Sequence, residues 1–121
     1  MGRQQTDVRT FKVIKAHEAS FPNPVRTSKG EVLAAEERET LWEGWLLCIN
    51  QQGEEVWIPK SFVDRQGDMA IMRRDNDSIE LTVMLGGELT GGEEAAGWVW
   101  VTNQAGENGW VPLVNLEERN T

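Results

Sequence analysis

The feature that most constrains the fold of this chain is an internal repeat. Residues 44–64, GWLLCINQQGEEVWIPKSFVD, return as residues 97–117, GWVWVTNQAGENGWVPLVNLE, at an offset of 53 positions without a gap. Eight of the 21 aligned pairs are identical: Gly44/Gly97, Trp45/Trp98, Asn50/Asn103, Gln51/Gln104, Gly53/Gly106, Glu54/Glu107, Trp57/Trp110 and Pro59/Pro112. The 121 residues therefore divide into two small units, each near the lower size limit for an independent core.

Each copy of the repeat predicts a β-hairpin. In the first copy, residues 45–49 and 56–58 are short apolar runs rich in strand-forming residues, and a polar Asn-Gln-Gln-Gly connection lies between them. The connection suits a type I turn that begins at Asn50, with Gly53 in the positive-φ conformation that other residues resist. Pro59 ends the second strand because it cannot donate to a β-ladder. Residues 60–62 then suffice for one helical turn before Val63 re-enters a sheet.

The same pattern resembles the second half of a Src-homology-3 (SH3) domain, from its third strand through the one-turn helix to its last strand. The whole chain is similar to small bacterial proteins with two variant SH3 domains in tandem. The resemblance implies an all-β protein of two five-stranded SH3-like barrels that pack on each other. It places the barrels at residues 11–65 and 67–118, after a loose segment 1–10.

The segments outside the repeat complete this expectation. Residues 11–16, FKVIKA, are the expected first strand of barrel one, and Met69 to Met72 that of barrel two. Residues 34–43 contain four glutamates and predict a solvated loop or one helical turn with Trp42 folded back. The connection at residues 65–67 is too short for a flexible tether, so we expect a fixed relative orientation of the barrels.

Strand alternation predicts which side chains form the cores. Leu46 and Cys48 share one face of their strand, and Val99 and Val101 share the matching face in the second copy. A barrel this small has room for one inward row, and these rows are its best candidates. The tryptophans of both strands are therefore expected to point outward.

The resemblance also implies a ligand groove in each repeat. The residues that match the groove positions are Trp45, Trp57, Pro59 and Phe62 in repeat one and Trp98, Trp110 and Pro112 in repeat two. Lys15 and His17 stand where the family has groove tyrosines, and Asn115 stands where repeat one has Phe62. Because Phe62 supplies an aromatic wall that Asn115 cannot, we expect repeat one to carry the better groove.

Three kinds of partner fit these residues. An aromatic groove accepts an extended or polyproline-type peptide, which loses little entropy on docking. Acidic residues near the groove would attract a basic flank of such a proline-rich ligand: Glu18, Asp75, Asp77 and Glu80. One alternative is a structural or regulatory subunit that binds one folded protein through its whole surface, and burial of the tryptophans of one repeat against the other repeat would favour it. Another is an aromatic cage for a methylated amine.

Composition argues against several other classes of function. A net charge of −8 disfavours nucleic acid and anionic membranes as partners. We expect no cysteine-type catalytic pair, because Cys48 alternates inward and His17 falls in a loop. One His and one Cys cannot build a usual zinc site, and no cofactor is expected. The start MGRQQTDVRT has no apolar core that could serve as a signal or a span, so a cytoplasmic, non-enzymatic protein is expected.

Overall fold

The computed structural model describes residues 9–20, 24–36, 38 and 43–119, and over these residues the chain is all-β, as predicted. Twelve strands and two single turns of 3-10 helix follow in this order: β1 (Arg9–Val13), β2 (Arg26–Thr27), β3 (Val32–Glu36), β4 (Trp45–Ile49), β5 (Glu55–Pro59), η1 (Lys60–Phe62), β6 (Val63–Gln66), β7 (Met69–Met72), β8 (Asn76–Asp77), β9 (Glu88–Ala95), β10 (Trp98–Thr102), β11 (Asn108–Pro112), η2 (Leu113–Asn115) and β12 (Leu116–Arg119). No described residue belongs to a helix with the length and apolarity needed to cross a membrane.

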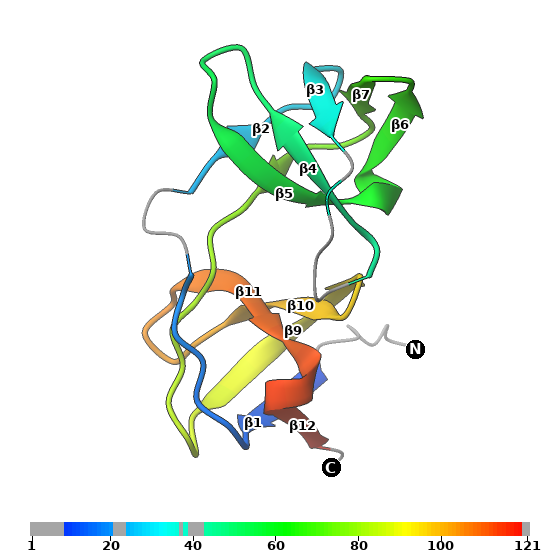
Figure 1. Cartoon of the computed structure of the whole chain (residues 1–121). Coiled ribbons are helices and arrows are strands. Elements are labelled where there is room, and N and C mark those ends of the chain that lie inside the picture. The colour runs from blue at the N-terminus through cyan, green and yellow to red at the C-terminus, as the bar shows by residue number, and fades with distance from the viewer. Residues whose placement is uncertain (1–8, 21–23, 37, 39–42, 120–121) are drawn as a thin grey trace, which may run out of the picture. The chain divides into compact units, whose positions relative to one another are not determined.

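The strands form two five-stranded antiparallel sheets, one in each of two compact units (Figure 1). The first-repeat unit, Phe21–Ile79 with Ala95–Gly97, has the strand order β5-β4-β3-β7-β6 and also contains the short β2–β8 pair. The second-repeat unit consists of Met1–Ser20, Glu80–Glu94 and Trp98–Thr121. Its sheet has the order β11-β10-β9-β1-β12.

The composition of the sheets corrects the expected division into barrels at residues 11–65 and 67–118. Strand β1 was expected beside the strands of repeat one, but it pairs with β9 and β12 of repeat two. Strand β7 was expected in repeat two, but it pairs with β3 and β6 of repeat one. Figure 1 shows blue β1 beside β12, and green β7 beside β3 and β6. The two repeats have thus exchanged their first strands within one chain.

The segment expected to link the barrels is part of this exchange. Residues 65–67 were predicted to be a connection between barrels, but β6 and β7 form a hairpin in which Gln66 lies opposite Met69. Gly67 makes the tight turn with a φ of +61°. A two-residue turn returns the chain to the sheet that it has just left, so the strand after it adds to repeat one.

The segments that follow β1 and β7 are exchanged as well. After β7, strand β8 pairs with β2, which precedes β3, through the partners Arg26↔Asp77 and Thr27↔Asn76. After β1, His17 forms an antiparallel bridge with Val83, which precedes β9. The chain therefore passes between the units after Ser20 and after Ile79, and again at either end of the short segment Ala95–Gly97. Each unit contains sequence from both halves of the protein.

Both exchanged strands are held by the same backbone hydrogen bonds. In the first-repeat unit, Gly30 N donates to Met72 O at 2.7 Å and Met72 N donates to Glu31 O at 2.9 Å. In the second-repeat unit, Gly86 N donates to Val13 O at 2.9 Å and Val13 N to Gly87 O at 2.8 Å. Met72 and Val13 are therefore structurally equivalent, and so are the strands β7 and β1.

The predicted hairpins are confirmed in both copies, with Leu47 opposite Trp57 in β4–β5 and Trp100 opposite Trp110 in β10–β11. In the first turn, Gly53 has a φ of +84° and donates to Asn50 O at 3.0 Å. The side-chain oxygen of Asn50 accepts from Gln52 N and Glu54 N, and its amide nitrogen donates to the Glu54 carboxylate at 2.8 Å. The second turn repeats these contacts around Asn103.

The predicted inward rows are also confirmed. Leu46, Cys48, Val99 and Val101 are all at most 2% exposed. The core of the second-repeat unit comprises Phe11, Val13, Leu81, Val83, Leu89, Val99, Val101, Val111 and Leu116. Phe11 and Val13 come from β1, so the exchanged strand contributes directly to this core. Its removal would expose apolar area of this core.

The region expected to be a loop or helical turn begins as strand. Residues 34–36 continue β3, in which Ala34 lies opposite Ile49. The rest of that expectation falls on Trp42 and its neighbours, which lie outside the described residues. The expectation of a loose N-terminus likewise concerns residues 1–8, which are not described, whereas Arg9 and Thr10 belong to β1.

Candidate peptide-binding surface

The groove residues of repeat one lie on one face of the β4–β5 hairpin and on the turn after it. Trp45 lies opposite Pro59 and Leu47 lies opposite Trp57, so these four side chains share a face. Trp45 and Trp57 are half-buried, whereas Pro59 is fully buried. Two partly accessible indole rings are therefore present on this face, as a ligand surface would require.

The indole of Trp45 is anchored within the first-repeat unit. Its ring nitrogen donates to the carbonyl of Ala96 at 3.0 Å. Gly44, with a φ of +90°, precedes it, and a Cβ at that position would lie 3.0 Å from the Cβ of Ala96. Glycine is needed at position 44 for its backbone angle and for this close approach. A ligand carbonyl would compete with Ala96 for the indole donor.

Phe62 is less accessible than a groove wall would be. Its side chain is 5% exposed, and the guanidinium of Arg74 lies 4.1 Å from the centre of its ring. A guanidinium over an aromatic face is attracted by the ring quadrupole. The aromatic wall expected at Phe62 is thus occupied by a cation from the segment after β7.

The groove positions of repeat two are buried, which corrects the expectation that these tryptophans point outward. Trp98 is 8% exposed, Trp110 is 4% exposed and Pro112 is buried. His17 packs edge-on against Trp98 at 5.4 Å between ring centres, and Trp100 packs in the same way on Trp110 at 5.3 Å.

A glycine in β11 allows the backbone near residue 80 to lie against this strand. Gly109 stands where repeat one has Val56, and a Cβ on it would lie 2.8 Å from Leu81 N. The missing side chain lets the backbone at Glu80 and Leu81 approach β11, where Leu81 N donates to Trp110 O at 3.1 Å. The alternation of side chains along β10 could not predict that this face is covered, because the covering segment lies near residue 80, outside the repeat.

Asn115 has a structural role that the sequence comparison with Phe62 missed. Its side chain is buried, and its amide nitrogen donates to Lys15 O and Ala16 O at 3.0 Å each. The backbone carbonyl of Asn115 accepts from Ile14 N and Lys15 N. Asn115 therefore fixes the segment directly after β1. The signal available in the sequence was an asparagine directly after the apolar pair Leu113-Val114.

The acidic residues expected to attract a basic ligand lie mainly in internal contacts. Asp75 accepts from Lys29 N at 2.8 Å, and Asp77 pairs with Arg26 at 3.1 Å. Glu80 lies 3.0 Å from the His17 ring and accepts from Ser20 N. Each of these contacts joins segments from the two halves of the sequence. Glu18 is exposed.

Cys48 is the single cysteine of the chain, and it lies in the core. The Cys48 thiol is completely buried, and this burial raises its pKa to about 11, so it stays protonated at neutral pH. Among the described residues, no three His, Cys, Asp or Glu side chains are grouped as metal ligands would be.

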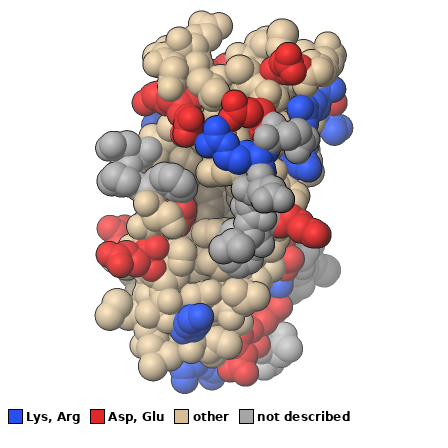
Figure 2. Space-filling view, in the orientation of Figure 1, with Lys and Arg blue, Asp and Glu red and all other residues tan. Residues whose placement is uncertain are grey.

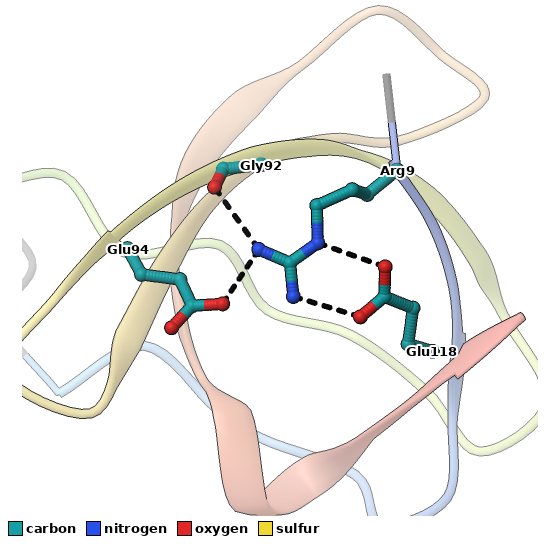
Figure 3. A network of polar contacts seen from close by, with 4 residues as sticks. All are labelled: Arg9, Gly92, Glu94 and Glu118. Carbon is teal, nitrogen blue, oxygen red and sulfur yellow. Dashed lines mark hydrogen bonds and ion pairs between the residues drawn. The ribbon is translucent and has the colours of Figure 1, made fainter. Parts of the chain in front are cut away.

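An ion-pair network at the start of β1 was not predicted (Figure 3). The Arg9 guanidinium donates to both carboxylate oxygens of Glu118, at 2.8 and 2.9 Å, and also reaches Glu94 at 2.5 Å and Gly92 O at 3.2 Å. These contacts raise the pKa of Arg9 and lower that of Glu118. The network ties β1 to both of its neighbours in the sheet.

Charged groups do not form one large patch on the face shown in Figure 2, where Lys and Arg lie in small groups near Asp and Glu. Comparison with known proteins gives no further guide, because no family model, curated protein or solved structure matches the chain.

Proposed function

We propose that this chain is a non-catalytic protein-binding module made of two SH3-like barrels with exchanged first strands. Two observations support the SH3-like description. Each unit has the order of hairpin, proline, 3-10 turn and final strand that the resemblance implies. Each sheet also runs from the second hairpin strand to the final strand in the same spatial order.

The observation that carries the binding proposal is the pair of half-buried indoles in repeat one. Trp45 and Trp57 lie on neighbouring strands of one hairpin face, and both retain accessible surface. Trp98 and Trp110, at the same positions of repeat two, are buried. An extended, proline-rich peptide with a basic flank is the ligand that flat indole surfaces on an acidic protein would accept.

Titration of the full chain with a proline-rich peptide tests this proposal. Amide and indole NMR shifts should concentrate at Trp45 and Trp57, and Trp57→Ala should weaken binding about 30-fold, the equivalent of ~2 kcal/mol. Trp100→Phe, on the other repeat, is the matched control and should leave the affinity unchanged. Shifts confined to Trp98 and Trp110 would show that the groove lies in repeat two and not in repeat one. An absence of shifts would refute the groove.

The second candidate, a structural or regulatory subunit for one folded protein, is favoured by a different observation. The groove positions of repeat two are buried, and the indole donor of Trp45 already bonds Ala96 O. In this case binding would spread over a broad surface. Trp57→Ala would then change affinity for the natural partner by less than about tenfold, and proline-rich peptides would not compete for it.

A further inference from the structure

The outward face of the first-repeat sheet carries several adjacent apolar side chains, of which Val32, Ala34 and Met69 are exposed and Ile49 and Ile71 are half-buried. They alternate with buried neighbours, so Val32 is 40% exposed beside Leu33 at 1%, and Met69 is 46% exposed beside Ala70 at 0%. We call the following five residues the outer face: Val32, Ala34, Ile49, Met69 and Ile71. The pairings Val32↔Ile71, Ala34↔Met69 and Ala34↔Ile49 make them lateral neighbours on β3, β4 and β7.

The second-repeat unit provides an internal comparison, because the same sheet positions exist there. The register of β1 against β9 reproduces that of β7 against β3, with Lys12↔Glu88 and Thr10↔Thr90. At every equivalent of an outer-face residue the second unit has a polar side chain: Val32/Glu88, Ala34/Thr90, Ile49/Thr102, Met69/Thr10 and Ile71/Lys12. The fold therefore forms with polar side chains at all five positions.

Apolar side chains at these positions are not needed to build the sheet, so they require another explanation. Adjacent exposed apolar side chains on one face of a protein mark an interaction site more often than isolated ones do. The first-repeat sheet thus presents a surface that its structural twin, formed by the same chain, lacks.

Charges around the outer face indicate what it binds. Across the sheet, one lateral row runs Gln66, Met69, Ala34, Ile49 and Glu55, and the next runs Asp64, Ile71 and Val32. Glu55 and Asp64 are exposed and have no ion-pair or hydrogen-bond partner for their carboxylates in the described part of the chain. Neither row contains a Lys or Arg.

We propose that the outer face docks a partner protein through a basic amphipathic segment, whose apolar side chains cover Met69, Ile49 and Ile71 while its Lys or Arg residues meet Glu55 and Asp64. A second copy of this chain fits less well, because a symmetric contact would bring the same carboxylates together on a protein with a net charge of −8. Ile49 and Glu55 lie on the same face of the β4–β5 hairpin as Trp57, so this surface adjoins the proposed groove, but its ligand is different and the proposal does not depend on a proline-rich peptide.

Two variants separate the docking surface from the fold. Met69→Thr with Ile71→Lys gives the outer face the residues that the second-repeat unit carries at Thr10 and Lys12, so a folded protein is expected. Thr102→Val, at the second-repeat equivalent of Ile49, is the control. Amide spectra of both variants should keep the native dispersion.

The binding probe is a synthetic amphipathic peptide of Leu and Lys, compared with a Leu and Glu peptide of the same pattern. The proposal expects NMR shifts at Val32, Ile49 and Ile71 with the Lys peptide alone, and affinity that falls as salt rises. Met69→Thr with Ile71→Lys should weaken binding at least about tenfold, whereas Thr102→Val should not.

Several results would overturn this proposal. They are equal binding of the Glu peptide, shifts that lie elsewhere, no binding of either peptide at millimolar concentration, or a dimer in sedimentation that Ile71→Lys dissociates. Binding of a proline-rich peptide at Trp57 is measured in parallel. Loss or retention of proline-rich peptide binding in these variants concerns the groove alone. The two proposals can therefore fail independently of each other.

Discussion

At the scale of single residues, four of the eight identities between the two repeats are explained by the backbone and the turn of the hairpin. Gly44 and Gly97 have φ values of +90° and +88°, and Gly53 and Gly106 have φ values of +84° and +87°. The Asn and Glu of each turn bond to one another and to the turn backbone. These identities are therefore explained by the structure of the hairpin. The identical tryptophans, in contrast, have different exposures in the two copies.

The turn asparagines should be important for stability in both copies. Asn50→Ala removes three side-chain hydrogen bonds, so we expect a loss of about 1–3 kcal/mol in the free energy of unfolding. Asn103→Ala should have a similar effect. Urea denaturation measures both. Gln51→Ala is the control, because Gln51 is also identical in the two repeats but is exposed; an equal loss for Gln51→Ala would contradict the turn explanation.

The Arg9 network should make stability depend on pH. The pKa of Glu118 is lowered from its ordinary value of 4.5 by Arg9, so its contribution is present above that value and is lost as pH falls through the folded-state pKa. Arg9→Met should therefore destabilise the protein at pH 7, and the difference from wild type should shrink toward pH 3. Arg119→Met, which removes an arginine next to Glu118 on β12, is the control. Parallel stability curves for wild type and Arg9→Met would contradict this role.

At the scale of elements, local turn chemistry made the hairpins predictable, whereas the sheet partners of β1 and β7 could not be predicted from the sequence. The turns need only Asn50, Gly53 and their counterparts, and the inward rows follow from alternation. Phe11-Lys12-Val13 and Ala70-Ile71-Met72 fit either sheet by pattern, so alternation alone cannot assign β1 or β7. The burial of Trp98 and Trp110 depends on His17 and on the backbone at Leu81, which are remote in sequence.

Substitution of Gly109 tests whether the Glu80–Leu81 backbone lies close to β11. Gly109→Val would place a side chain where the Cβ alone meets Leu81 N at 2.8 Å, so we expect a loss of about 1–3 kcal/mol or more. Thermal and urea denaturation would measure it. Repeat one carries valine at the equivalent position, Val56, so strand propensity cannot explain a loss. Unchanged stability would show that the Glu80–Leu81 backbone does not lie against β11.

At the scale of the whole molecule, the exchange makes each unit depend on both halves of the chain. Phe11 and Val13 complete the core of the second-repeat unit, while Ala70 and Met72, both at most 2% exposed, do so in the first. The two repeats are therefore expected to unfold together. The fixed relative orientation was predicted from residues 65–67 as the connection between the repeats, but these residues form the β6–β7 turn within the first-repeat unit. The orientation itself stays a prediction, which relaxation measurements on the two units can check.

Cutting the chain between the repeats tests this dependence. Residues 1–66 and 67–121, expressed separately, each lack the strand that completes their sheet, and we expect poor amide dispersion from each alone. Mixing should restore the native spectrum in a one-to-one complex. If each fragment alone already gave the amide shifts it has in the intact chain, each repeat would be complete without the other.

The strand exchange itself is tested most directly by nuclear Overhauser contacts of β1 in the intact protein. The exchange places Lys12 opposite Glu88 and Glu117, and Thr10 opposite Thr90 and Arg119. A chain without exchange would place β1 in the slot of β7, with Lys12 opposite Val32 and Asp64. We predict cross-strand contacts between Thr10 and Thr90. Contacts of Lys12 with Val32 in their place would contradict the exchange.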